Sequence, residues 1–98
     1  MTVTIKGKEY AVKNNIMAMM IFEELRKKAF RIETITDQMV YLYSMVVAAN
    51  QNEFPTWEEF VDAATPKFLA EFGEFLAEEA KKTDIFGDEG KEGSKKNP

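Results

Sequence analysis

Residues 39–49 read MVYLYSMVVAA, and this segment decides the fold. Nearly every position is apolar, so the segment lacks the polar face that a surface helix turns toward water. Such a helix is stable only when other elements cover most of its sides. We therefore expect a central helix with Thr36 as its N-cap and Asp37 at its positive end, running to about Ala49 with Asn50 as a left-handed cap.

The preceding segment, residues 16–28, predicts a second helix capped by one of the two asparagines before it, because it contains neither glycine nor proline. Spacings of three and four residues define one apolar stripe for packing, which comprises Met17, Ala18, Ile21, Phe22, Leu25 and Ala29. Ile16, Met19 and Met20 lie beside this stripe, so the core does not account for them.

The N-terminal residues 2–13 alternate between apolar and polar on both sides of Gly7-Lys8, which is typical of a β-hairpin. Glycine at the first of two loop positions favours a type II′ turn. That turn would pair Ile5 with Tyr10, and Val3 with Val12. Because an isolated hairpin is marginal in water, we expect this apolar face to pack on the helices.

Two further helices are predicted after the central one. Thr56 and Glu59 have the spacing of a capping box, and Thr65-Pro66 suits a helix start with proline at its first position. The last helix carries a stripe of apolar residues, namely Phe68, Leu69, Phe72, Phe75, Leu76 and Ala80.

From residue 83 the chain becomes rich in glycine and charge, which predicts a flexible tail over residues 83–98. Residues 1–82 then form a single globular domain. The expected fold class is α+β and mainly helical, with an N-terminal hairpin packed on a bundle of about four helices.

The composition excludes several classes of function. The 98 residues contain no histidine and no cysteine, which removes His- or Cys-dependent catalysis, zinc sites with nitrogen or sulfur ligands, and disulfides. The formal charge is 13 − 17 = −4, so the chain lacks the positive field that nucleic-acid binding requires. With neither an 18-residue apolar stretch nor a secretory signal pattern, we expect a soluble cytoplasmic protein and no membrane partner.

The remaining acidic residues give no sign of catalysis. Doublets such as Glu23-Glu24 and Glu58-Glu59 would project about 100° apart on a helix and cannot converge on one reacting atom or metal ion. We expect no enzymatic activity, no catalytic or metal-binding residues and no cofactor. A carboxylate enzyme would need a pocket with two facing acids.

Methionine and phenylalanine are abundant, with six and eight copies respectively. Methionine repacks readily against varied partners and is common on adaptable binding surfaces. The predicted stripes do not use all of these residues, so we expect some of the surplus to form an exposed patch for another protein. The candidate protein-binding residues are Met19, Met20, Trp57, Ile85 and Phe86.

The order of segments resembles the tail assembly chaperones of long-tailed bacteriophages and prophages. The resemblance covers about residues 3–80 and rests on the opening IKGKEYAVKNNIMAMMIFEELRKKAF, on MVYLYSMVVAAN, on FPTWEEFVD and on the closing stripe. It implies a non-enzymatic chaperone in the bacterial cytoplasm that binds tail tube protein, tape measure protein or both during tail assembly. A different interpretation is a small regulatory adaptor or inhibitor that binds a host protein.

Overall fold

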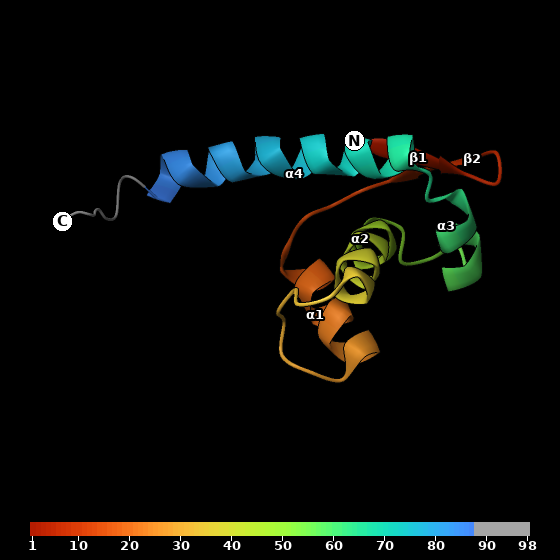
Figure 1. The fold of residues 1–98 in the computed structure, drawn as a ribbon, viewed down its shortest axis with the longest axis horizontal. Helices are drawn as coiled ribbons and strands as arrows, with labels where there is room; N and C mark the ends of the chain where they lie inside the picture. The colour runs from red at the N-terminus through yellow and green to blue at the C-terminus, as the bar shows by residue number, and fades with distance from the viewer. Residues whose placement is uncertain (88–98) are drawn as a thin grey trace.

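A computed structural model describes the backbone of residues 1–87 and the side chains of residues 1–81. Within this range the chain forms an antiparallel hairpin followed by four helices (Figure 1). The expected α+β, mainly helical class is therefore confirmed. The hairpin and the last helix lie along one side of the molecule, and the first two helices lie together on the other side.

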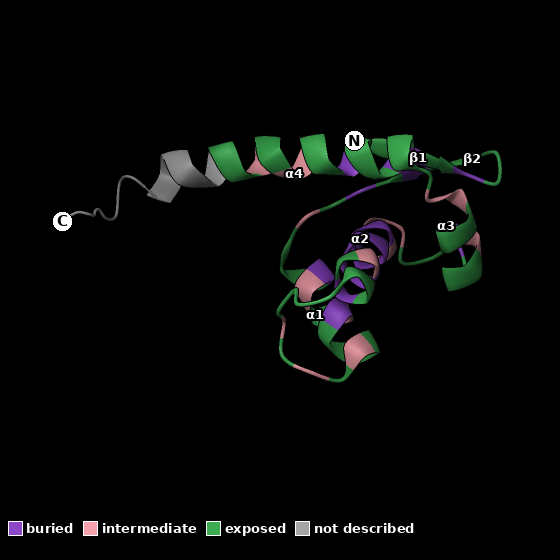
Figure 2. Cartoon of the chain, viewed as in Figure 1, coloured by how far each residue is buried: buried purple, intermediate pink, exposed green. Residues whose placement is uncertain are grey.

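The central helix α2 spans Ile35–Ala49, and its burial explains its apolar sequence. Every residue from Val40 to Val46 is buried, as the purple turns of α2 show in Figure 2. The tyrosine hydroxyls in this run find polar partners: that of Tyr41 donates to the side chain of Asn14, and that of Tyr43 to the carbonyl of Pro55. The prediction of a helix covered on most sides is confirmed.

The predicted N-cap of α2 is wrong, whereas Asn50 is the C-cap as predicted but does not adopt the left-handed conformation. Thr34, not Thr36, is the N-cap, and its hydroxyl accepts a hydrogen bond from the amide of Asp37 at 3.0 Å. This choice is favoured because the Asp37 carboxylate then accepts the amide of Glu33 at 2.9 Å, so two unpaired donors are satisfied together. At the other end Asn50 has φ −137°, and its side chain donates to the carbonyls of Val46 and Ala11 instead of forming a left-handed cap.

The hairpin consists of β1 (Thr2–Ile5) and β2 (Lys8–Ala11), but its predicted register is wrong. Val3 pairs with Tyr10, and the loop is Lys6-Gly7. Both loop residues have positive φ, 54° and 77°, as a type I′ turn requires. Glycine occupies the second of these positions, whereas the prediction placed it at the first. The loop therefore begins one residue earlier than predicted.

The apolar face of the hairpin is nevertheless the predicted one. Val3, Ile5, Tyr10 and Val12 are all buried. The pairing differs from the prediction by an even number of residues, and an even shift keeps each side chain on its original face. A backbone hydrogen bond from Lys13 to Met45 ties the end of the hairpin to α2 at 3.1 Å.

Helix α1 spans Ile16–Arg26 and packs against α2 through a narrower stripe than predicted. Ala18 and Phe22 are buried, whereas Met17 and Leu25, which the prediction places in the stripe, are exposed. Asn15 is the N-cap, as expected. The helix ends two residues early, since Lys27 turns left-handed with φ 58°.

Helices α3 (Trp57–Ala63) and α4 (Pro66–Gly87) begin as predicted. Thr56 and Glu59 form the complete capping box, and the hydroxyl of Thr65 accepts the amide of Phe68 at 3.1 Å. The ring of Phe60, on α3, is central to the packing here. It lies 5.6 Å from the ring of Phe68 and 6.2 Å from that of Phe72, so α4 is held mainly by its first turns.

Beyond those turns α4 projects from the rest of the fold (Figure 1). Of its predicted stripe, Phe68 and Phe72 are buried, Phe75 and Leu76 are half-buried, and Leu69 and Ala80 are exposed. The helix continues to Gly87, past the predicted start of the tail at residue 83, and residues 88–98 lie outside the description. No helix in the described part of the chain has both the length and the apolar character needed to cross a membrane.

Candidate functional site

The structure separates the predicted protein-binding residues. Met19 is half-buried and packs against the core, whereas its neighbour Met20 is 54% exposed. Trp57 is 36% exposed and lies at a different place, on α3. The side chains of Ile85 and Phe86 lie outside the described residues, so their predicted role is untested.

Met20 belongs to an exposed apolar surface that we name the α1 patch, made of Ile16, Met17 and Met20. Ile16 is 68% exposed, and Met17 is also exposed. The three side chains are neighbours because residues three and four positions apart lie on the same side of a helix. The patch exists because α2 covers only the arc of α1 around Ala18 and Phe22.

Trp57 belongs to a second surface, a groove of about 270 Å³ that we name the Trp57 groove. Its floor is one face of α2, formed by Thr36, Val40 and Tyr43, which the helical spacing places in a row. One wall is Leu25 and Arg26 at the end of α1, and the other is Trp57. Residues from three elements thus meet in one mainly apolar hollow.

Tyr43 fixes the Trp57 wall of this groove. Its ring meets that of Trp57 edge to face, with centroids 5.5 Å apart, and its buried hydroxyl donates to the carbonyl of Pro55 at 2.7 Å. Burial, aided by the nearby charges of Glu58 and Glu59, raises the pKa of the Tyr43 hydroxyl. The hydroxyl therefore stays protonated and keeps donating at neutral pH.

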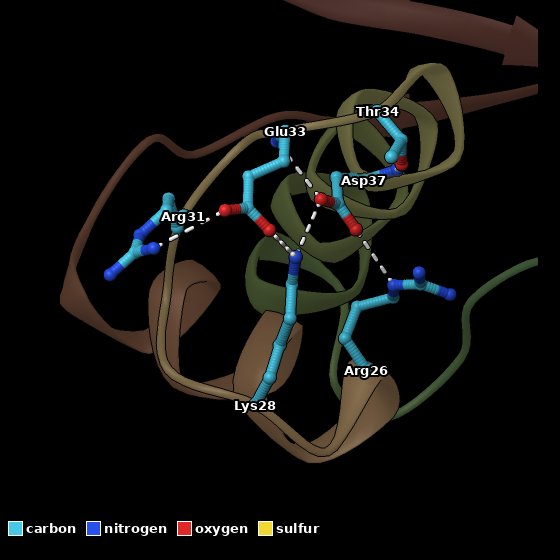
Figure 3. A network of polar contacts seen from close by, with 6 residues as sticks. All are labelled: Arg26, Lys28, Arg31, Glu33, Thr34 and Asp37. Carbon is cyan, nitrogen blue, oxygen red and sulfur yellow. Dashed lines mark hydrogen bonds and ion pairs between the residues drawn. The ribbon is translucent and has the colours of Figure 1, made fainter.

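The Arg26 wall is fixed by a charge network around Asp37, which is fully buried (Figure 3). The Nε of Arg26 donates to Asp37 Oδ1 at 2.9 Å, and the Nζ of Lys28 donates to Asp37 Oδ2 at 2.7 Å. Glu33 extends the network, since its carboxylate pairs with both Lys28 and Arg31. The connection between α1 and α2 is thereby held against the start of α2.

The pKa of the Asp37 carboxyl is held far below its usual range. The largest cause is the hydrogen bond from Lys28, and the amide of Glu33 and the side chain of Arg26 act in the same direction. Burial opposes them but does not prevail. Asp37 is consequently ionised at neutral pH, and its negative charge anchors Arg26.

The Trp57 groove and the Asp37 network were not among the sequence predictions. One signal was available for the network: Asp37 lies just ahead of the most apolar run of the chain and follows the basic segment from Arg26 to Arg31. Buried acids are normally paired, so cationic partners nearby in sequence were its natural candidates. The groove had no such signal, because its residues come from three separate segments.

A smaller hollow of about 110 Å³ lies between α2 and α4. Its lining is mostly apolar and includes Ile35, Met39, Leu42, Leu69, Phe72 and Leu76. Ile35 is largely exposed here, because it follows the Thr34 cap directly and points away from the core. This hollow adds to the apolar surface on the α2 side of α4.

The described residues contain no cluster of three acidic side chains placed to hold a metal ion. Comparison of the chain with protein-family models, with curated proteins and with solved structures found no match. The arrangement of the site itself therefore carries the functional argument. What the arrangement offers is apolar contact, through the α1 patch and the Trp57 groove.

Proposed function

We propose that this protein is a non-enzymatic binding module that holds another protein through exposed apolar side chains. The observation that carries the proposal is the α1 patch. Ile16 and Met20 are 68% and 54% exposed although the same helix buries Ala18 and Phe22 completely. Large apolar side chains gathered on one exposed helix face are typical of a protein interaction site.

The chemistry of the α1 patch suits a client whose surface varies in shape. Two of its three members are methionines, whose unbranched and polarisable side chains adapt to different neighbours. Burying one such side chain at an interface contributes roughly 1.5–3 kcal/mol before the cost of association is subtracted. Two or three anchors of this kind support reversible binding, as a chaperone needs.

The charge of the chain fits the same role. A net charge of −4 on a small domain favours solubility and opposes self-association through exposed apolar residues. A protein that covers an aggregation-prone client benefits from that balance of apolar contact and like-charge repulsion.

The class of client comes from the resemblance to tail assembly chaperones of bacteriophages and prophages. We infer that the clients are tail tube protein, tape measure protein or both, bound in the cytoplasm of a bacterial host before the tail is complete. The resemblance rests on the order of the hairpin, the apolar helix and the closing helices.

Co-expression with the neighbouring reading frames tests this function. The proposal expects a tail protein frame and a very long tape-measure-like frame beside this gene, and expects at least one of their products to be retained by the tagged protein. Retention should fall when Met20 is replaced by Ser. Retention of a host enzyme or transcription factor in place of both tail products would favour a regulatory adaptor and reject the chaperone role.

A further inference from the structure

The Trp57 groove has one charged group on its lining, and that group points to the chemistry of its occupant. The groove is otherwise lined by Leu25, Val40, Tyr43, Trp57 and the small hydroxyl of Thr36. The guanidinium of Arg26 is held at one end of this apolar surface. A ligand that fills the groove therefore meets apolar contact and a fixed cation at once.

Arg26 is only partly used by the fold. Asp37 binds its Nε, and the two terminal nitrogens point away from Asp37 in Figure 3. No acceptor among the described side chains, residues 1–81, bonds these two nitrogens, and the side chain is 33% exposed. A guanidinium presents paired donors that match a carboxylate, so Arg26 retains a free binding edge.

The surrounding charges leave this edge attractive to an anion. The network contains the cations Arg26, Lys28 and Arg31 and the anions Glu33 and Asp37, so its formal charge is 3 − 2 = +1, on a chain whose total is −4. One further carboxylate at Arg26 would neutralise the network. Glu58 and Glu59, which act on Tyr43 from α3, disfavour an anion at that side and so orient the occupant.

We propose that the Trp57 groove binds a client segment that carries a large apolar side chain close to a carboxylate. The apolar side chain lies between Leu25 and Trp57 on the α2 floor, and the carboxylate pairs with the terminal nitrogens of Arg26. Asp37 acts as a positioning residue, because it orients the guanidinium from behind. The inference rests on the proposed function, since it names the chemistry of the client segment.

N-acetyl-leucine and its uncharged counterpart N-acetyl-leucinamide test the groove without a client. Both probes are titrated into the full chain carrying a nitrogen-15 label, and amide chemical shifts report where each one binds. We expect shifts at Leu25, Val40 and Trp57, with the carboxylate probe bound roughly fivefold more tightly than the amide because its hydrogen bonds to Arg26 are charge-assisted. Equal affinities, shifts elsewhere, or no binding of either probe at its solubility limit would overturn the proposal.

Matched variants separate the two parts of the groove. Arg26→Gln should abolish the preference for the carboxylate probe, whereas Lys27→Gln, one residue along and outside the groove, should leave it intact. Leu25→Ser should weaken both probes, whereas Ile32→Ser, an exposed aliphatic position outside both the groove and the α1 patch, should weaken neither. If Arg26→Gln perturbs folding, the wild-type preference and the Leu25→Ser comparison still decide.

The outcomes also separate this inference from the proposed function. Binding of the carboxylate probe without any retained tail protein would reject the chaperone role and leave the groove assignment standing. Retention of a tail protein by a chain that shows no preference for the carboxylate probe would reject the groove assignment alone.

Discussion

Phe60 connects three helices, so replacing its ring by an aliphatic side chain tests the packing of the C-terminal half of the fold. The side chain is fully buried on α3. Its ring centroid lies between 5.4 and 6.2 Å from those of four other aromatic residues, namely Tyr43, Trp57, Phe68 and Phe72. Replacement by Leu keeps an apolar side chain and removes all four ring contacts.

The expected loss follows from those four contacts. Aromatic pairs contribute roughly 0.5–1.5 kcal/mol each beyond the area that they bury, and the lower end of that range gives about 2 kcal/mol for four pairs. A small domain has roughly 5–15 kcal/mol of stability in total, so Phe60→Leu should still fold. With a urea dependence of about 1 kcal/mol per molar, its unfolding midpoint should fall by about 2 M.

Phe54→Leu is the matched control, because Phe54 is 45% exposed and precedes α3. Surface replacements away from special features change stability by less than about 0.5 kcal/mol, so this variant should unfold close to the wild type. Urea unfolding followed by circular dichroism measures both variants. Equal midpoints for the two variants, or a Phe60→Leu midpoint within about 0.5 M of the wild type, would refute the role assigned to Phe60.

Three other predictions follow from single contacts. Asp37 has a lower pKa in the folded than in the unfolded chain, so its ionised form stabilises the fold above about pH 4, and this contribution disappears as pH falls further. The melting temperature of Asp37→Asn should therefore be below that of the wild type at neutral pH and approach it in acid. A difference in melting temperature that stays constant with pH would contradict the network. Tyr43→Phe removes the donor to the buried Pro55 carbonyl and should lower the free energy of unfolding in urea by about 1–2 kcal/mol. The hydroxyl of Tyr10 has no hydrogen bond to the described residues, so Tyr10→Phe should lower it by less. Met19→Ser should lower the free energy of unfolding by about 2 kcal/mol because Met19 packs on the core, and Met20→Ser should leave it nearly unchanged. Similar losses for both variants would contradict the assignment of Met20 to an exposed patch.

The sequence predicts the parts of this fold that depend on local chemistry. The apolar run of α2 requires burial wherever it is placed, and the Thr56 capping box needs only residues three apart. The hairpin register is different, because shifting the pairing by two residues keeps Val3 and Tyr10 on the same face. Alternation alone cannot separate those registers, and the turn decides between them.

Tertiary contacts decide the remaining features. Thr34, unlike Thr36, has an acidic residue three positions on, and the capture of Asp37 by Arg26 and Lys28 adds to this local preference for Thr34 as the cap. The arc of α1 that α2 covers likewise decides which of its methionines are exposed. The Trp57 groove could not be predicted at all, since no local pattern shows that the ends of α1 and α3 flank one face of α2.

The central claim is that the α1 patch binds client protein by apolar contact, and calorimetric titration of a retained tail protein tests it most directly. The double variant Ile16→Ser/Met20→Ser should bind at least roughly tenfold more weakly, since its two most exposed anchors are lost, while its melting temperature stays close to that of the wild type. Ile32→Ser, an exposed apolar position outside the patch, should bind like the wild type. An unchanged affinity of the double variant would contradict the account.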